Sequence, residues 1–275
     1  MSRGEIVVAI EDVRFSYPGG ARALDGVSLE IARGTGLGVV GQNGSGKTTL
    51  AKHLNGLLRP TAGRVVVEGL DTARHPVRAL ARHVGYVFQN PGHQLFARTV
   101  AAELAFGPRN LGVAPDEIDA RVASVAETLQ LADVLTVHPY RLPLPIRKLV
   151  TIASVLTMRP SVLVLDEPTT GQDHRTSRRI TEVIDRVRAG GTTVVCVTHD
   201  MTLLAAISDR AVVLHDGRIA ADESPRAVLS DRALMAATRL RPPQVTELSL
   251  GMPGRGDRPG ALSVGELVDE IRSAS

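Results

Sequence analysis

Short runs of hydrophobic and β-branched residues recur along the chain, separated by polar segments that contain glycine. Runs of this length are typical of strands, and here they alternate with longer stretches of helical periodicity. The predicted strands are Ile6–Ile10, Val27–Ile31, Leu37–Val40, Arg64–Val67, Val84–Phe88, Val162–Leu165, Thr193–Val197 and Ala211–Leu214. Asp216-Gly217, after the last of them, predicts a two-residue hairpin turn. The alternation favours an α/β fold.

The strand pattern stops between about residues 91 and 158, where a helical pattern replaces it. The segment Asp116–Leu129 shows this most clearly, because its hydrophobic residues recur every three or four positions. These residues are Ile118, Val122, Val125 and Leu129. We therefore expect a helical subdomain, at about residues 91–158, inserted into the α/β core.

A C-terminal extension, residues 241–275, follows a main domain that we place at residues 1–240. The stretch Gly251–Gly260 is rich in glycine and proline, which predicts a flexible or turn-rich linker. Ser263 and Glu266 then have the spacing of a helix capping box. Hydrophobic residues fall on one face of the short helix that follows: Val264, Leu267, Val268 and Ile271. We expect this helix either to dock on its own domain or to contact a second subunit or another partner.

The composition is that of a globular protein with an aliphatic core, since 43% of the residues are hydrophobic and only 3% are aromatic. Few aromatic rings, a net charge of +3 and the absence of a Lys/Arg block give no reason to expect nucleic-acid binding. No stretch approaches the roughly 18 apolar residues of a membrane span. We therefore expect a soluble, cytoplasmic protein that needs a membrane-spanning partner if it acts at a membrane. Cys196, the single cysteine, is expected in the core.

Residues 41–48 carry the most specific chemical signal in the chain, Gly-Gln-Asn-Gly-Ser-Gly-Lys-Thr, which is a complete phosphate-binding loop. Its glycines let backbone N–H groups close around phosphates, Lys47 reaches the β- and γ-phosphates, and the Thr48 hydroxyl can bind Mg²⁺. A predicted strand, Leu37–Val40, enters the loop, and a predicted helix, Thr49–Leu54, leaves it. A helix N-terminus therefore points at the bound anion, a context that a chance glycine-rich turn would lack.

Two acids, Asp166 and Glu167, end the predicted strand Val162–Leu165. In nucleotide-binding folds an acid at this place holds Mg²⁺, directly or through water, and the next acid can polarise an attacking water. Strands often end in exposed acids, so the pair alone would be a weak signal. Behind an intact phosphate loop it is a strong one, and Glu167 is the candidate general base.

Three further residues are candidates for the same site, although each alone has a plainer interpretation. Gln89 follows a predicted strand and could bind Mg²⁺ through its carbonyl oxygen, but it could be an ordinary loop residue. His199 also follows a strand and could contact the γ-phosphate or an attacking water, or simply be a packed or exposed histidine. Tyr17 could stack on adenine or only pack locally. The predicted nucleotide-binding residues are Tyr17, Gly41, Asn43, Gly44, Ser45, Gly46, Lys47, Thr48, Thr49 and Gln89.

The order of these signals along the chain resembles the nucleotide-binding subunit of an ABC transporter over about residues 5–235. Three segments narrow the resemblance to the ATPase subunits of energy-coupling-factor importers, which take up vitamins and transition-metal ions: Tyr86–Ala97, Ala105–Gly112 and Pro242–Leu248. The resemblance implies a P-loop NTPase core with a mainly parallel sheet, an antiparallel β subdomain and the inserted helical subdomain. It also implies that ATP and Mg²⁺ are bound.

The resemblance assigns a role to each candidate residue. It implies adenine stacking by Tyr17, catalysis by Glu167 and γ-phosphate sensing by His199. The implied Mg²⁺ ligands are Thr48, Gln89 and Asp166. The apolar stretch Leu95–Phe106 is expected to be either subdomain core or a docking groove for a membrane protein.

The chain departs from the family at the signature motif, Leu-Ser-Gly-Gly-Gln, which grips the γ-phosphate bound on the opposite subunit. Leu142 lies at the family's distance of 24 residues before Asp166, but Pro-Leu-Pro-Ile follows it at residues 143–146. Proline has no N–H group, and leucine and isoleucine offer no polar side chain, so we expect the phosphate grip to be lost. Pro145 is tolerated in a first helical turn, so the following helix should remain. Gln172 also stands where the family usually has leucine, which puts the coupling between the two sites in doubt.

ABC ATPases enclose two nucleotides between two subunits, and each site combines one chain's phosphate loop with the other chain's signature. A homodimer of this chain would have two damaged sites, whereas a heterodimer with an intact-signature partner would have one complete site. We therefore expect an ATP-hydrolysing subunit of an asymmetric heterodimer. It would work at the cytoplasmic face of the membrane with a transmembrane coupling protein and a substrate-binding membrane protein. The alternatives are a non-catalytic regulatory nucleotide-binding subunit and the ATPase of another ABC transporter type.

Overall fold

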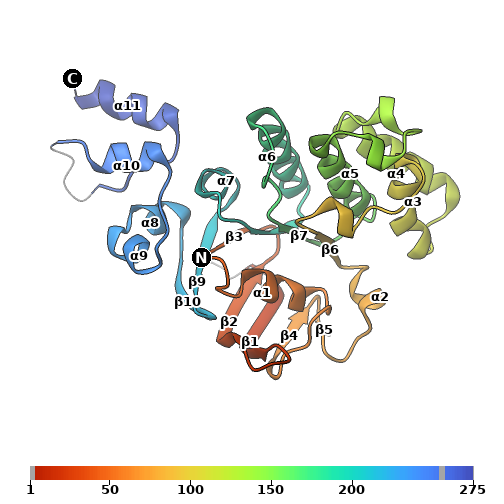
Figure 1. Cartoon of the computed structure of the whole chain (residues 1–275), viewed down its shortest axis with the longest axis horizontal. Helices are drawn as coiled ribbons and strands as arrows, with labels where there is room; N and C mark the ends of the chain where they lie inside the picture. Colours follow the sequence, from red (N-terminus) through yellow and green to blue (C-terminus); the bar gives the residue numbers. More distant parts are fainter. Residues whose placement is uncertain (1–3, 254–257, 275) are drawn as a thin grey trace.

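Two β-sheets share a hydrophobic core in the computed structural model, which describes residues 4–253 and 258–274 (Figure 1). The larger sheet runs in the order β10 (Arg218–Glu223), β9 (Arg210–His215), β3 (Gly36–Val40), β8 (Thr193–Val197), β7 (Val162–Asp166) and β6 (Val84–Val87). Its strands are parallel except for β10, which pairs with β9 in an antiparallel hairpin. The smaller sheet is antiparallel and runs in the order β2 (Arg22–Ala32), β1 (Ile6–Ser16), β4 (Ala62–Val67) and β5 (Leu70–Asp71). The expected α/β fold with a mainly parallel sheet and an antiparallel sheet is confirmed.

All the strands predicted from the sequence are present, but β1 is longer than expected and continues to Ser16. Its pairing shifts register between Ile10 and Val13, and Asp12 has a positive φ of 43°. Such a bulge interrupts the alternation of hydrophobic and polar residues, so the strand predicted from the sequence ended at Ile10 instead of Ser16. The predicted turn after β9 is confirmed: Asp216 and Gly217 have φ values of 46° and 75°, as a two-residue hairpin turn requires.

Helices cover both faces of the larger sheet (Figure 1). On one face, α1 (Lys47–Leu54) packs between the two sheets, so that its buried residues join a core with both of them. On the other face, α6 (His174–Ala189) and α7 (Met201–Ile207) pack against alternate residues of β7 and β8. Cys196 of β8 belongs to this second core and is buried, as predicted. A short helix, α2 (Val77–Leu80), precedes β6.

Between β6 and β7 the chain is helical, in agreement with the sequence pattern. The elements are η1 (Pro91–His93), α3 (Val100–Asn110), α4 (Pro115–Thr128), η2 (Ala132–Val134), η3 (Pro139–Arg141) and α5 (Leu144–Leu156). Ile118 and Val122 of α4 and Leu129 after it are buried in one core with α3 and α5. In Figure 1 these helices lie together beyond the β6 edge of the sheet. The domain boundaries at residues 91 and 158 remain predictions.

The C-terminal part forms more helix than the sequence pattern indicated: α8 (Pro225–Ser230), α9 (Arg232–Ala237), α10 (Gln244–Leu250) and α11 (Val264–Ala274). The Ser263 Oγ accepts a hydrogen bond from the Glu266 N–H at 3.2 Å, so half of the predicted capping box is formed. Within the predicted linker Gly251–Gly260, residues 254–257 lie outside the described residues. None of the described helices is long and apolar enough to cross a membrane.

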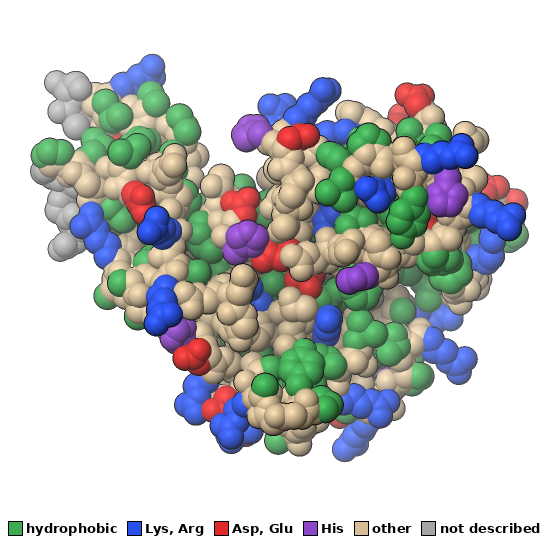
Figure 2. All heavy atoms as spheres, in the orientation of Figure 1, with side chains coloured by type: hydrophobic (Ala, Val, Ile, Leu, Met, Phe, Trp, Pro, Cys, Tyr) green, Lys and Arg blue, Asp and Glu red, His purple; other side chains and the backbone are tan. Residues whose placement is uncertain are grey.

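Helix α11 docks on its own domain through polar side chains. Arg226 of α8 forms an ion pair with Glu266 at 2.9 Å, and the Ser249 hydroxyl donates to Glu270 at 2.7 Å. Val264 and Val268, from the predicted hydrophobic face, are 66% and 38% exposed, and Figure 2 shows hydrophobic side chains over this part of the surface. Of the two alternatives for this helix, docking is therefore found, and contact of its outer face with a second subunit or another partner remains a prediction.

Candidate functional site

The predicted site residues meet at the carboxyl edge of the larger sheet. Gly41 follows β3, Glu167 follows β7, and Gln89 and His199 come shortly after the ends of β6 and β8. These four strands are parallel and in register, so that their ends lie side by side. Ligands of open α/β sheets bind in the crevice at this edge. The strand order therefore explains why residues so far apart in the sequence converge.

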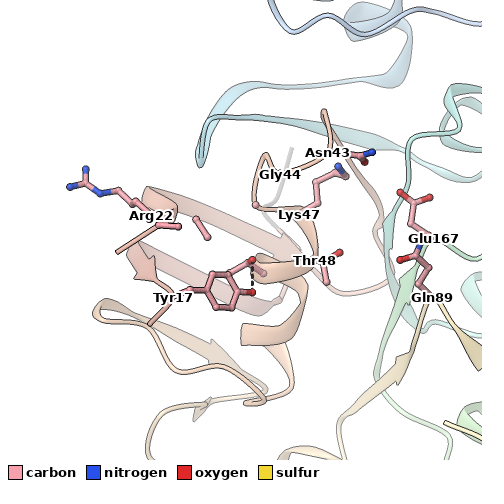
Figure 3. A pocket seen from close by; sticks show the side chains of 12 residues that line it. Tyr17, Arg22, Asn43, Gly44, Lys47, Thr48, Gln89 and Glu167 are labelled. Atoms are coloured by element: carbon pink, nitrogen blue, oxygen red, sulfur yellow. Dashed lines mark hydrogen bonds between the residues drawn. The ribbon is translucent and has the colours of Figure 1, made fainter. Parts of the chain in front are cut away.

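A cavity of about 320 Å³ contains most of the predicted residues (Figure 3). In Figure 3, Gln89 and Glu167 lie on one side of the cavity and Lys47 and Thr48 on the other. The lining comprises Tyr17, Asn43, Gly44, Gly46, Lys47, Thr48, Thr49, Gln89 and Glu167, together with Ala21, Arg22 and Ala23. The size is in the range typical of small-ligand sites, about 300–1,000 Å³.

The conformation of the phosphate loop depends on glycine at position 46. Gly46 has φ +104°, and a Cβ there would lie 2.4 Å from the Ala23 carbonyl oxygen, so only glycine fits. This residue caps α1, which starts at Lys47, two residues earlier than the sequence pattern indicated. Among the described residues, the buried Ser45 hydroxyl has no hydrogen-bond partner. An unpartnered buried hydroxyl at a helix N-terminus suits an incoming anion such as phosphate.

The Lys47 ammonium group is held over the loop. Its Nζ donates to the carbonyl oxygens of Gly41 and Gln42, each at 2.8 Å. Burial lowers the pKa of Lys47, while the negative charges of Glu167 and Asp166 oppose this shift. Lys47 is thus a buried cation that an anionic ligand would stabilise further.

Thr48 and Asp166 form the oxygen-rich part of the site. The Thr48 hydroxyl donates to Asp166 Oδ1 at 3.1 Å, and the Tyr86 hydroxyl donates to Oδ2 at 2.9 Å. Burial raises the pKa of Asp166, and the two hydrogen bonds partly oppose that shift. Thr48 and Gln89 line the cavity, whereas Asp166 does not line it and reaches the site through its hydrogen bond with Thr48. The side-chain oxygens of these three residues are the kind of donor that Mg²⁺ prefers.

Glu167 and His199 form a contact that was not predicted from the sequence. His199 Nδ1 lies 2.7 Å from Glu167 Oε2, and the Thr170 hydroxyl donates to the same oxygen at 3.1 Å. Glu167 has a positive φ of 49°, a conformation that costs energy for a residue with a side chain. The chain therefore holds this carboxylate in one orientation, at the edge of the cavity.

Tyr17 stands at the far end of the cavity from Glu167 (Figure 3). Its hydroxyl is 3.0 Å from the Thr49 hydroxyl, and its ring meets the edge of Phe15 at 4.9 Å between centroids. The side chain remains 39% exposed. An aromatic ring that is fixed in position yet partly exposed suits stacking on a planar base.

Residues 142–146, the segment predicted from the sequence to be a degenerate signature, lead directly into a helix, as expected. Pro143 is the N-cap of α5 and Pro145 lies in its first turn, so the helix is kept without a side-chain cap. Leu144 is 41% exposed, and its Cδ2 lies 3.9 Å from the place that a Cβ on Gly171 would occupy. The segment therefore lies beside the loop that carries Gln172.

Three residues of this region were not assigned a role from the sequence: Tyr86, Thr170 and Lys148. Tyr86 and Thr170 bind the two acids, and Lys148 of α5 is fully buried with its ammonium on the Phe88 and Gln89 carbonyl oxygens. Their only sequence signals were a hydroxyl within a buried strand, a threonine near two acids and a lysine followed by a hydrophobic run. Such signals are too common to identify a site without the tertiary contacts.

Comparison with known proteins agrees with this geometry. The family model described as ABC transporter matches residues 24–170, and one for an AAA domain matches residues 146–205. The cobalt import ATP-binding protein CbiO of Rhodobacter capsulatus is 42% identical over 89% of this chain and 88% of its own length. The energy-coupling factor transporter ATP-binding protein EcfA of Methanothermobacter thermautotrophicus is 37% identical over 88% of this chain and 78% of its own length.

Another relative is much longer than this chain. It is an ABC transporter ATP-binding protein of Caldanaerobacter subterraneus, and it is 40% identical to this chain. The match spans 90% of this chain but only 44% of that protein. Among solved structures, CbiO1 of Clostridium perfringens, described as part of the complex CbiONQ, matches with a TM-score of 0.76 and 31% identity over 89% of this chain and 98% of its own. The cassette MJ0796, in a dimeric post-hydrolysis state bound to ADP and Pi, matches with a TM-score of 0.73 and 25% identity, covering 80% and 99%.

The likeness extends over the phosphate loop, the sheet and the helices between β6 and β7, since the relatives cover nearly the whole described fold. The site geometry, the family match and these relatives agree with one another. The chain belongs to the ABC transporter family and is an ATP-binding subunit of the kind that hydrolyses ATP.

Proposed function

We propose that this chain powers the uptake of a vitamin or a transition-metal ion through an energy-coupling-factor type transporter. The observation that carries the proposal is the cavity in which Lys47, Thr48, Gln89 and Glu167 face one another. The similarity to a cobalt import protein and to an energy-coupling factor protein supports the importer class. The subunit would lie at the cytoplasmic face of the membrane, bound to a transmembrane coupling protein and a substrate-binding membrane protein.

ATP would lie along the cavity with adenine on Tyr17 and its phosphates in the loop of residues 41–48. Thr48, Asp166 and Gln89 would hold Mg²⁺, which would neutralise charge on the phosphates. Glu167 would take a proton from the attacking water, because it lies at the edge of the cavity with an orientation that His199 fixes. His199, 59% exposed in its side chain, would contact the γ-phosphate.

The contrast between this intact set and the signature segment supports an asymmetric heterodimer. Leu144 and Ile146 have no side-chain donor, and Pro143 and Pro145 have no N–H group, so the chain has little to offer a nucleotide on its partner. Each lost hydrogen bond to a charged phosphate is worth about 1.5–3 kcal/mol. A partner with an intact signature would complete the site on this chain, while the partner's own site would bind ATP and hydrolyse it slowly.

The test is the ATPase rate of the chain alone, compared with the chain co-purified with an ABC ATPase that has an intact signature. We expect activity in the mixture at least about 100-fold above that of the chain alone, because one missing donor to developing charge costs roughly 10²–10³ in rate. A rate for the pure homodimer equal to that of the full transporter would overturn the heterodimer proposal.

An exposed aromatic pair on the helical segment is the candidate contact for the membrane protein. Phe96 and Phe106 are 61% and 45% exposed, and their rings meet edge to face at 4.7 Å between centroids. The rest of the predicted groove is different: Leu95, Val100 and Leu104 are buried in the core of this segment. Figure 2 shows hydrophobic side chains on this side of the molecule. The docking surface would therefore be the two phenylalanines and not the whole stretch.

Replacing Phe96 with aspartate is expected to reduce substrate uptake by roughly tenfold or more, because a central aromatic anchor commonly contributes 2 kcal/mol or more, in round terms, to an interface. ATP binding should be unchanged, since Phe96 does not line the nucleotide cavity. Uptake into vesicles and ATP affinity are measured on the same complex. The matched control is Leu57→Asp, at another exposed hydrophobic position, 44% exposed. Equal uptake by Phe96→Asp and wild type would reject this surface.

A further inference from the structure

Lys148 is fully buried and reaches from α5 to the loop that carries Gln89. Its Nζ donates to the main-chain oxygen of Phe88 at 3.0 Å and to that of Gln89 at 2.9 Å. A buried ammonium group is costly unless it is hydrogen-bonded, and these two carbonyls are the partners that the structure gives it. Lys148 therefore joins α5, the helix that follows the signature segment, to Gln89, which lines the nucleotide cavity.

We propose that Lys148 is a positioning residue, which holds the main chain at Gln89 and so sets the place of the Gln89 side chain in the nucleotide cavity. The ammonium group donates to the backbone of the loop at Phe88 and Gln89, and the Gln89 side chain lines the cavity (Figure 3). The proposal rests on the placement of Gln89 in the nucleotide site. Lys148 itself does not line the nucleotide cavity, and it connects α5 to the main chain at Gln89.

Two further contacts show that the loop after β6 is tied to α5 and its approach at several points. Gln94 accepts from the Phe88 N–H at 3.2 Å and donates to the Thr151 carbonyl oxygen at 2.8 Å. The Tyr140 hydroxyl, just before the signature segment, donates to the Leu95 carbonyl oxygen at 3.1 Å. The loop is therefore hydrogen-bonded to α5 through Gln94 and to the segment just before α5 through Tyr140. Lys148 is the contact nearest to Gln89.

The signature segment also starts the helix that carries Lys148. Pro143 and Pro145 start α5 at a fixed residue, and Lys148 lies in the second turn of that helix. Leu144, in the first turn of the same helix, is 41% exposed.

Hydrogen exchange of the loop tests the connection without any need for activity. In Lys148→Met, which keeps the length and burial of the side chain, amide exchange in residues 88–95 should be faster by about tenfold, as expected for loss of a hydrogen bond to a charged group. Lys148→Arg keeps donors and should restore most of the protection. The control is Arg78→Met, an exposed position on α2. Unchanged exchange in folded Lys148→Met would overturn the proposal.

Kinetics then decide whether the connection acts through Gln89. In the complex with an intact-signature partner, Lys148→Met should lower kcat by about tenfold while KM for ATP changes less than threefold or so, because the phosphate loop is untouched. In a Gln89→Ala background the same change should have almost no further effect on kcat. Independent, multiplying effects of the two substitutions would overturn the role of Lys148 through Gln89. If the wild-type complex itself did not hydrolyse ATP, that result would count against the proposed function. The hydrogen-exchange result would still test the Lys148 contact, because it does not depend on activity.

Discussion

Replacing Glu167 with glutamine is expected to abolish ATP hydrolysis in the complex with an intact-signature partner. The amide has nearly the shape of the carboxylate but cannot accept a proton, and general-base catalysis contributes roughly 10²–10⁴ in rate. We therefore expect kcat to fall by about that factor. ATP affinity should stay within a few-fold of wild type, because Lys47 and the phosphate loop remain. Phosphate release and equilibrium ATP binding measure the two quantities.

The same substitution separates an enzyme from a regulatory subunit. Glu127→Gln is the matched control, because Glu127 lies on an exposed side of α4 and does not line the nucleotide cavity. If this chain served only to stabilise an assembly, transport by Glu167→Gln would equal that of the control. Transport that persists at the wild-type rate would thus favour the non-catalytic alternative over the one proposed here.

Restoring the family signature is expected to activate the chain on its own. Substituting residues 143–146 with Ser-Gly-Gly-Gln returns a hydroxyl and backbone N–H groups at the positions that face a nucleotide on the opposite subunit. We expect the ATPase rate of the pure homodimer to rise by roughly 10²–10³, the effect of one well-placed donor to developing charge. The new glycines should cost about 1 kcal/mol each in α5, so thermal unfolding is measured alongside.

A second variant distinguishes donors on the main chain from polarity alone. Leu144→Ser with Ile146→Ser adds hydroxyl groups but keeps Pro143 and Pro145, so the missing N–H groups do not return. This variant should remain close to the low rate of the unchanged chain. A homodimer with a restored signature, correctly folded and still inactive, would show that the defect lies elsewhere, for example at Gln172.

The fold was largely predictable because its signals are local. A buried strand between turn residues, such as Val162–Leu165, needs no partner to be recognised, and the phosphate loop has a fixed spacing. The errors also have local causes. The bulge at Asp12 shortened the prediction of β1, and short helices such as α9 and α10 have too few turns for a periodicity to appear.

The candidate site was predicted less completely than the fold. Gln89, Glu167 and His199 each follow a strand, so the parallel sheet brings them together once the strand order is known. Tyr86 and Lys148 contact residues that are distant in the sequence, whereas Thr170 contacts Glu167, three residues before it. A hydroxyl or an ammonium group carries no pattern of its own, and its role depends on which oxygen it meets.

The sequence by itself determined the α/β class, the phosphate loop at residues 41–48 and the absence of polar side chains from residues 143–146, because each depends on residue types at fixed positions. Only the tertiary structure decided that Phe96 is exposed while Leu95 is buried, that the polar side of α11 docks and that Lys148 binds the carbonyls at Gln89. The physical reason is that burial and hydrogen bonding are properties of packed neighbours, which a linear pattern does not contain.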